Sequence, residues 1–315
     1  MDGKKNELVS VVVPIYNVED DLLECIRSIQ NQTYDGSPDK CGEICDLLAK
    51  EDKRIVVIHQ NNGGLSRARN AGMQIMTGDF VVFVDSDDVL EEKFVENLLR
   101  LSYKYRAEIV VCQNSIFTKK KGVVHLHNQD RIEEKCFNTS DAIKEMLYQK
   151  EYDVAAWGKL YRSETLKGVT FPAGLIHEDI PTTYKIFLNA NNVVYTSEEL
   201  YRYQIRDNSI ENEKFTPKKM DCITTSQMML DDISTNYPEY LKAARSRYVA
   251  AHFHILAQIK QNSPERALII RNIKSVRKMV IRDKEATTRV RIACILSYFG
   301  FRTTVKVLDF VKRKH

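Results

Sequence analysis

Phe80-Val-Val-Phe-Val-Asp-Ser-Asp-Asp88 is the stretch of the sequence that decides the fold. Its first five residues are apolar, a pattern typical of a strand buried on both faces of a parallel sheet. Its last four residues include three carboxylates. In open sheets of parallel strands, ligands bind beyond the carboxyl ends of the strands. The stretch therefore predicts a buried strand that ends in an acidic site.

Three adjacent carboxylates repel one another unless a cation or hydrogen-bond donors neutralise them. Hard divalent cations such as Mg²⁺ and Mn²⁺ take carboxylate oxygens and often share the phosphates of a substrate. The pattern favours a metal ion that bridges Asp85-Ser-Asp-Asp88 to a diphosphate. The alternative is an acidic turn that caps the helix expected to begin near Glu91.

Apolar runs and helical patterns alternate on both sides of this stretch, which predicts an α/β fold with a parallel sheet. After Asn114 the periodicity weakens, and residues 115–138 are expected to form a hairpin or loop. The chain is predicted to be helical from about Pro217. We expect strands at 8–15, 55–58, 80–84, 109–112 and 195–205, and helices from 19, through 44–48, at 65–76 and at about 91–105.

The composition indicates a globular protein of two parts. At 43% hydrophobic and 29% charged residues, the 315-residue chain is neither disordered nor collagen-like. We expect one α/β domain over residues 1–207 and a helical region over 208–315. The net charge of +4 hides an excess of Lys and Arg over Asp and Glu, 14 to 4, in residues 263–315. The acidic remainder argues against a protein that binds nucleic acid throughout.

The sequence predicts a cytoplasmic protein. No apolar run reaches the roughly 18–20 residues that span a bilayer, and the polar segment Met1–Glu7 lacks the features of a signal peptide. The seven cysteines are scattered, which is typical of reduced thiols rather than of disulfides or a zinc site.

Several other residues suit a ligand site, each with a structural alternative. Tyr16 suits stacking on a flat base, or it caps the core at a strand end. Arg69 suits a phosphate, or it lies on a solvated helix face. Trp157 suits a sugar ring, or it belongs to the core. In Glu178-Asp179, a carboxylate suits a general base, or the pair begins a helix.

Taken together, these segments closely resemble the family 2 glycosyltransferases. The resemblance covers about residues 8–207 and is most specific in residues 8–90. It implies a GT-A fold with a Rossmann-like, mostly parallel sheet, a nucleotide-sugar donor, expected to be a UDP-sugar, and inversion at the anomeric carbon. The matching segments are Val11–Asn17, Ser28–Tyr34, Asp35-Gly-Ser37, Asn62–Gly72, Gly78-Asp-Phe80, Phe83–Asp88, Trp157–Tyr161 and Glu178-Asp179.

The resemblance also implies roles for single residues. Asp179 would be the catalytic base, with Glu178 in support. Asp85 and Asp87 would hold the divalent metal, Mn²⁺ or Mg²⁺, with Asp87 the better ligand. The acceptor side would include Trp157 and Lys159. The nucleotide-sugar would meet Pro14, Tyr16 and Asn17 at its base, Asp35 at uracil, Arg69 near its phosphates, and also Asn62, Asp85 and Ser86.

The sequence departs from the family pattern at one place. Family members usually carry a strand of about eight or nine residues between Gln-Thr-Tyr and Asp-Gly-Ser, whereas Asp35 here follows Tyr34 directly. The second strand of the usual sheet is therefore expected to be absent. Its loss would leave an unpaired edge or force the segment Ile55–Gln60 to close up. It would also affect the uracil contact of Asp35.

The C-terminal segment suggests a membrane surface as a partner. Val290–Phe301 is apolar but too short to span a bilayer, and basic residues follow it. Such segments suit a helix in the interface of an anionic membrane, and the alternative is an ordinary packing helix with a solvated tail. The resemblance favours the membrane, because many such enzymes use lipid-linked acceptors.

The sequence supports two functions. The first is transfer of a sugar to a glycan or lipid-linked glycan in cell-surface or exopolysaccharide synthesis, at the inner face of the plasma membrane. The second is a catalytically impaired GT-A scaffold that binds a partner or a membrane, which the missing strand motivates.

Overall fold

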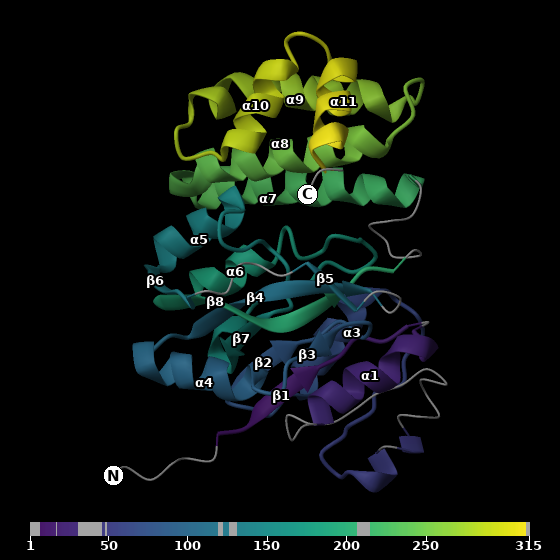
Figure 1. The fold of residues 1–315 in the computed structure, drawn as a ribbon, viewed down its shortest axis with the longest axis vertical. Helices are drawn as coiled ribbons and strands as arrows, with labels where there is room; N and C mark the ends of the chain where they lie inside the picture. The colour runs from purple at the N-terminus through teal and green to yellow at the C-terminus, as the bar shows by residue number, and fades with distance from the viewer. Residues whose placement is uncertain are drawn as a thin grey trace. The chain divides into compact units, whose positions relative to one another are not determined.

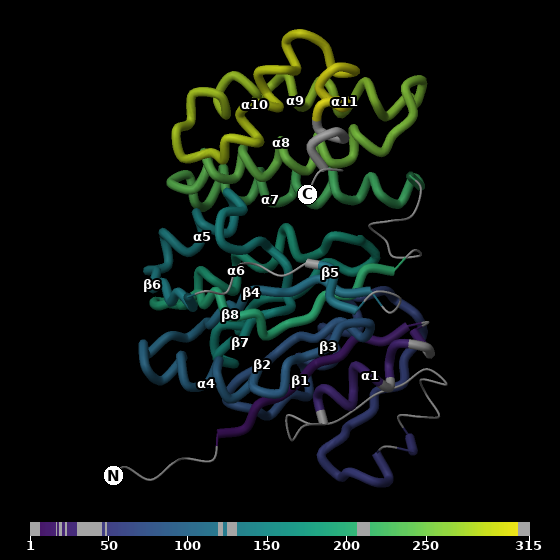
Figure 2. The backbone as a smooth tube through the Cα atoms, in the orientation of Figure 1, coloured from purple at the N-terminus to yellow at the C-terminus, as the bar shows by residue number. Residues whose placement is uncertain are grey.

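The computed structural model describes residues 7–16, 18–30, 46–47, 49–118, 122–125, 131–206 and 215–312 (Figure 2). The chain divides into two compact units. The sheet unit comprises Met1–Ala142, Ala155–Gly174 and Lys185–Ser209. The helical unit comprises Ile143–Val154, Leu175–Tyr184 and Ile210–His315, so it includes two segments that precede residue 207.

The sheet unit is built on one mixed sheet (Figure 1). Strands β1, β2, β4 and β8 run in the same direction, whereas β7 and β3 run against them. The strand order is β1 (Val9–Val12), β2 (Phe80–Phe83), β7 (Lys159–Arg162), β4 (Ile109–Thr118), β8 (Asn192–Gln204) and β3 (Val89–Leu90), with β5 (Gly122–His125) beside β4 and β6 (Glu134–Asn138) beside β8. This is the expected α/β sheet, and the carboxyl ends of its four parallel strands point to one edge.

Strand β2 has all four residues buried, as its apolar sequence predicts. Its Phe80 and Val82 side chains share a core cluster with Phe94 and Leu98 of helix α4 (Phe94–Tyr105). The polar residues Asp85–Asp88 follow just after this buried strand ends.

Helix α3 (Leu65–Ile75) packs unusually close to β1. A Cβ atom added to Gly72 would lie 2.5 Å from Cγ1 of Val12. Glycine at this position therefore sets the approach of α3 to the sheet. The remaining helices of the first 200 residues are α1 (Glu19–Gln30), α5 (Thr139–Tyr148), η1 (Ser163–Leu166) and α6 (Thr183–Leu188).

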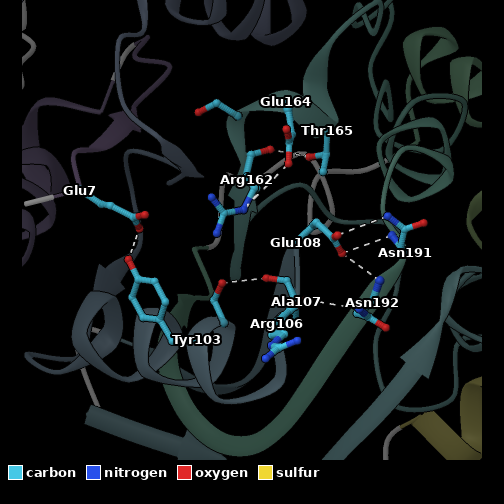
Figure 3. Close-up of polar contacts among 12 residues, drawn as sticks. Glu7, Tyr103, Arg106, Ala107, Glu108, Arg162, Glu164, Thr165, Asn191 and Asn192 are labelled. Carbon is cyan, nitrogen blue, oxygen red and sulfur yellow. Dashed lines mark hydrogen bonds and ion pairs between the residues drawn. The ribbon is translucent and has the colours of Figure 1, made fainter. Parts of the chain in front are cut away.

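Glu108 fixes the register of the sheet at the end opposite the acidic turn (Figure 3). Its Oε2 accepts hydrogen bonds from the backbone N–H groups of Asn192 (2.8 Å) and Asn191 (3.2 Å). Its own N–H donates to the carbonyl of Asn192 (3.1 Å), and its carbonyl accepts from the N–H of Arg162 (2.7 Å). One residue thus joins β4, β8 and β7 at this end of the sheet, and the pairing of β4 with β8 shifts register farther along, between Cys112 and Asn114.

The expected strand at Ile55–Ile58 is wrong. This segment has no strand structure, and only Ile55 is buried, whereas Val56 is 70% and Ile58 42% exposed. In the part of the chain that the structure describes, β1 pairs with β2 alone. The segment therefore does not close up against β1. Without a neighbouring strand its backbone gains no ladder of hydrogen bonds, and its β-branched residues alone do not make it a strand.

The other expected elements are found with shifted ends. Strand β4 continues to Thr118 and forms a hairpin with β5, within the segment expected to be a hairpin or loop. The helix expected through 44–48 lies largely outside the described residues, of which 46, 47 and 49–51 are helical.

The helical unit is a set of packed helices after residue 215. Helix α8 lies against α7, α9 and α11 (Figure 1), and its His252 is completely buried. None of the helices in the described ranges is long and apolar enough to span a bilayer. The elements are η2 (Pro217–Met220), α7 (Asp221–Asn236), η3 (Pro238–Tyr240), α8 (Leu241–Gln258), α9 (Glu265–Arg282), α10 (Thr288–Leu296) and α11 (Phe301–Lys312).

Candidate functional site

An arginine from α3 reaches the first carboxylate after β2. Nη2 of Arg69 donates to Oδ1 of Asp85 over 2.8 Å, and the Arg69 side chain is 2% exposed. The guanidinium also lies over the ring of Phe171, 5.4 Å from its centroid. Asn70, the next residue of α3, exchanges two hydrogen bonds with the backbone of Phe171. Arg69 is therefore fixed inside the sheet unit, which contradicts the solvated-face alternative.

Asp88 is buried at the centre of the acidic turn. Its carboxylate accepts hydrogen bonds from the Tyr201 hydroxyl (2.7 Å) and the Gln204 N–H (2.8 Å). Burial raises the pKa of Asp88 well above its usual range, and the charges of Asp87 and Asp85 add to this shift. The Tyr201 hydroxyl also accepts from the N–H of Asp85 (3.2 Å). Strand β8 thus holds the turn in place.

Asp87 forms an ion pair with a second arginine. Nη2 of Arg206 lies 2.5 Å from Oδ2 of Asp87, and Nη1 lies 3.4 Å from Oδ2 of Asp21. Burial raises the pKa of Asp87, the charge of Asp85 raises it further, and Arg206 opposes both effects. Nε2 of Gln204 donates to Oδ1 of Asp21 over 2.7 Å. We call Asp21, Asp85, Asp87 and Asp88 the acidic cluster.

Sequence reasoning missed Asp21 and the three residues of the β8 end that hold the cluster. Acidic residues are common in the first turn of a helix, so the position of Asp21 in the sequence gave no reason to assign it to a site. The residues Tyr201, Gln204 and Arg206 lie more than 110 positions from Asp85–Asp88. The single sequence signal for them was that the strand expected at 195–205 ends at the same sheet edge.

The donor set suits a hard divalent cation. All four members of the acidic cluster offer carboxylate oxygens, and two arginines leave the cluster negative even when Asp88 is protonated. Arg69 contacts one carboxylate oxygen of Asp85, and Arg206 contacts one of Asp87. Within the described ranges, no three His, Cys, Asp or Glu side chains are arranged to hold a metal ion. Asp85 and Asp87 would be a partial ligand set that substrate phosphates complete, as Mg²⁺ sites often are.

The expected base-binding residues lie at the end of β1. Pro14 is buried, and Tyr16 is 70% exposed. Since β1 and β2 are parallel neighbours, both segments leave the sheet at the same edge. Asn17 and Asp35 lie outside the described residues.

The structure also describes Asn62 and Ser86, two further residues expected to contact the nucleotide-sugar. Oδ1 of Asn62 accepts from the N–H of Gly64 (3.1 Å), where Gly64 has a φ of 79° just before α3. Ser86 is 6% exposed inside the acidic turn. Asn62 thus shapes the loop that leads into the Arg69 helix.

Trp157 and Lys159 lie at the start of β7, at the edge of the sheet that carries the acidic turn. The Trp157 ring stacks with Tyr201 (4.7 Å between centroids) and Tyr203 (5.5 Å). Lys159 is 2% exposed, and its Nζ donates to the Ala155 carbonyl over 2.6 Å. Trp157 therefore connects the core to the residue, Tyr201, that holds Asp88.

Glu178 and Asp179 belong to the helical unit. Glu178 is 3% exposed, and its carbonyl accepts from the Thr182 hydroxyl (2.6 Å). Oδ1 of Asp179 accepts from the N–H of Ile180 (2.8 Å). The preceding residue, His177, has a φ of 59°. The pair thus sits in a tight turn that leads to α6.

The family model described as "Glycosyl transferase family 2" matches residues 10–169, just over half of the 315-residue chain. The chain belongs to this family. The match includes β1, Arg69 and the acidic turn, whereas Arg206 and the Glu178-Asp179 pair follow it in sequence.

Curated relatives are about a third identical to this chain over the residues that align. Glycosyltransferase GlyA of Streptococcus pneumoniae is 33% identical over 257 residues, which are 76% of this chain but 37% of GlyA. Glycosyltransferase GlyG of the same species is 32% identical over 67% of this chain and 75% of GlyG. The minor teichoic acid biosynthesis protein GgaB of Bacillus subtilis is 32% identical over 63% of this chain and 23% of GgaB. The chain thus spans well under two thirds of GlyA and GgaB.

A solved structure supports the same fold. The structure of S. aureus TarS residues 1–349 in complex with UDP-GlcNAc has a TM-score of 0.67 and 19% sequence identity, and the match covers 98% of this chain and 92% of that chain. At this identity the likeness shows the GT-A fold of this family 2 chain.

Proposed function

We propose that this family 2 glycosyltransferase moves a sugar from a UDP-sugar to an acceptor hydroxyl, with inversion, in cell-surface or extracellular polysaccharide synthesis. The observation that carries the proposal is the acidic cluster at the carboxyl edge of the parallel strands, with buried Arg69 bonded to Asp85. The relatives' names, which include a teichoic acid biosynthesis protein, support the substrate class.

The donor site is proposed for the sheet unit. Exposed Tyr16 would stack on the base after β1, with Pro14, Asn17 and Asp35 at the nucleotide by resemblance. Arg69 would place positive charge near the phosphates, close to Ser86 and the Asn62 loop. Preorganised charges of this kind stabilise the charge that develops on a leaving diphosphate, and they lower the barrier more than flexible ones do.

A divalent cation, Mn²⁺ or Mg²⁺, would be held by Asp87 and Asp85. When bound, it would supply Lewis-acid stabilisation to the departing diphosphate. The protein's own part is to hold both carboxylates at the edge of the sheet, where Arg69 pairs with Asp85 and Arg206 pairs with Asp87.

The base is proposed to be Asp179 in the helical unit. Its carboxylate would take the proton of the acceptor hydroxyl as that oxygen attacks the anomeric carbon in a single displacement. Glu178 would orient the acceptor, with Trp157 and Lys159 also on the acceptor side. These roles rest on the family motif that the residues occupy. We likewise propose residues 1–207 as the catalytic part and 208–315 as the helical part.

The acceptor is proposed to be a glycan or lipid-linked glycan at the inner face of the plasma membrane. The region after residue 287 exposes several large apolar side chains beside an excess of Lys and Arg. Such a surface suits an anionic bilayer. Its exposed apolar members are Ile292, Ile295, Tyr298, Phe299 and Val307.

A donor-hydrolysis screen tests the function directly. The wild-type protein with Mn²⁺ is incubated with a panel of UDP- and GDP-sugars, and the released nucleotide is measured. We expect UDP release from one or a few UDP-sugars, and a loss of at least about 100-fold in Asp87→Asn. Asp46→Asn, an exposed carboxylate paired with His59, is the matched control and should retain activity.

Calorimetry with UDP and Mn²⁺ separates the enzyme from the non-catalytic scaffold. Heat of binding together with turnover supports the transferase. A folded protein that neither binds UDP nor hydrolyses any donor would refute it and favour the scaffold.

A further inference from the structure

Arg206 is placed between two carboxylates by the end of β8. Its guanidinium contacts Asp87 at 2.5 Å and Asp21 at 3.4 Å. Asp21 is itself held by Gln204, two residues before Arg206 on the same strand end. The guanidinium therefore has a defined position, set by a carboxylate that points to it from α1.

The ion pair with Asp87 is substantially shielded from water. The Arg206 side chain is 30% exposed, and that of Asp87 is 20% exposed. Charge pairs in such surroundings interact more strongly than pairs on an open surface, because water screens them less. A second cation that approaches Asp87 meets both competition for the carboxylate and repulsion from the guanidinium.

We propose that Arg206 is a built-in counter-ion for Asp87 that a divalent cation must displace. The proposal rests on the assignment of Asp87 as a metal ligand in the proposed function. In the nucleotide-free protein Arg206 neutralises the carboxylate, so the affinity for the free cation is low. Arg69, which pairs with Asp85, differs in burial: its side chain is 2% exposed, whereas that of Arg206 is 30% exposed and can move away from its carboxylate.

The alternative is that Arg206 serves only to orient Asp87. The two roles predict opposite effects of its removal. If Arg206 orients the carboxylate, its loss disorders a ligand and weakens metal binding. If Arg206 competes with the cation, its loss leaves the Asp87 carboxylate available and strengthens metal binding.

The experiment titrates Mn²⁺ alone into the full-length protein and follows the electron paramagnetic resonance signal of free Mn²⁺. We expect Arg206→Gln to bind Mn²⁺ about tenfold more tightly than the wild type, because the cation no longer has to displace a guanidinium from Asp87. Arg206→Lys keeps the charge and should bind close to the wild type. Arg100→Gln, which removes an exposed arginine of α4, is the control and should change nothing.

A double variant tests whether the effect passes through Asp87. In Asp87→Asn the further change Arg206→Gln should bring no gain, because the shared carboxylate is absent. A full tenfold gain in that background would overturn the proposal.

Several other results would overturn it too. One is Mn²⁺ binding by Arg206→Gln that is equal to or weaker than that of the wild type, in a protein shown to be folded by circular dichroism and melting temperature. Another is the absence of measurable Mn²⁺ binding by any of the proteins. The donor-hydrolysis screen is read separately. Tighter Mn²⁺ binding by Arg206→Gln without hydrolysis of any sugar donor would support the role of Arg206 and refute the transferase. Donor hydrolysis without tighter Mn²⁺ binding would support the transferase and refute the role of Arg206.

Discussion

Nη2 of Arg69 lies 2.8 Å from Oδ1 of Asp85, and the arginine is almost completely buried between α3 and the turn after β2. Removing one partner of a buried pair leaves the other charge without compensation. We predict that Arg69→Met lowers the free energy of unfolding by about 2–4 kcal/mol and raises the KM for the donor. Urea unfolding and steady-state kinetics measure the two effects.

Arg67→Met is the matched control for Arg69, because Arg67 is exposed on the same helix. It should leave both quantities nearly unchanged. Equal effects of the two substitutions would show that the ion pair has no special role.

Asp179→Asn should abolish sugar transfer and leave the binding of UDP intact. The amide cannot accept the proton of the acceptor hydroxyl, whereas the donor site proposed in the sheet unit is untouched. Transfer assays and UDP calorimetry on the same sample measure both. Full transfer by Asp179→Asn would remove this residue from the mechanism.

Gly72→Ala should destabilise the protein, although alanine ordinarily favours a helix over glycine. The added Cβ would lie 2.5 Å from Cγ1 of Val12, so α3 and β1 must move apart. We expect a loss of about 1–3 kcal/mol in the free energy of unfolding. The double variant with Val12→Ala should recover part of the loss, and Gln74→Ala, exposed on α3, should cost nothing. A neutral Gly72→Ala would contradict the close packing.

His252 should make stability depend on pH. Burial lowers its pKa from 6.5 to about 4, while its Nδ1 lies 2.8 Å from the Tyr248 carbonyl. Between these values the unfolded chain binds a proton that the folded protein does not. Stability from this residue is therefore complete above pH 6.5 and falls by about 3 kcal/mol as the pH drops to 4.

Urea unfolding at several pH values between 7 and 4 tests this prediction. His252→Gln should lose that part of the pH dependence, and His254→Gln, on the same helix, should retain it. An unchanged slope in His252→Gln would disprove the assignment.

Membrane binding should depend on the exposed apolar residues near α10. Ile295 is 44% and Phe299 79% exposed. Replacing both with Ser should weaken sedimentation with vesicles that contain anionic lipid by at least about tenfold, since each apolar side chain contributes about 1.5–3 kcal/mol on burial. Leu268→Ser, on α9, is the control. Undiminished binding after deletion of Ser297–His315 would refute the membrane proposal.

The sequence predicted those strands whose own residues form an apolar run that indicates burial. Phe80–Val84 is apolar throughout, so the strand and the acidic turn at its end could be located without knowing its neighbours. Ile55–Ile58 has a similar composition and failed, because a strand also needs a partner and the chain offers none there in the described residues. Composition reports burial, but pairing depends on distant parts of the chain.

The same limit applies to the site. Arg69 lies in a helix next to the acidic turn in sequence, and it was predicted to lie near phosphates. Gln204 and Arg206 meet Asp21 across more than 180 residues. No local pattern marks such a contact, because each residue is ordinary in its own segment.

The strands of the sheet are not synthesised in the order in which they lie side by side. Strand β7, which separates β2 from β4, is synthesised after β4, and the β8 end that holds Asp88 and Asp21 follows later still. A nascent chain that has not reached residue 206 carries four clustered carboxylates with one of their two arginines. Such a chain lacks the Arg206 partner of Asp87 and Asp21 and the Gln204 partner of Asp88 and Asp21. We therefore expect the acidic cluster to reach its native arrangement only after residue 206 has been synthesised.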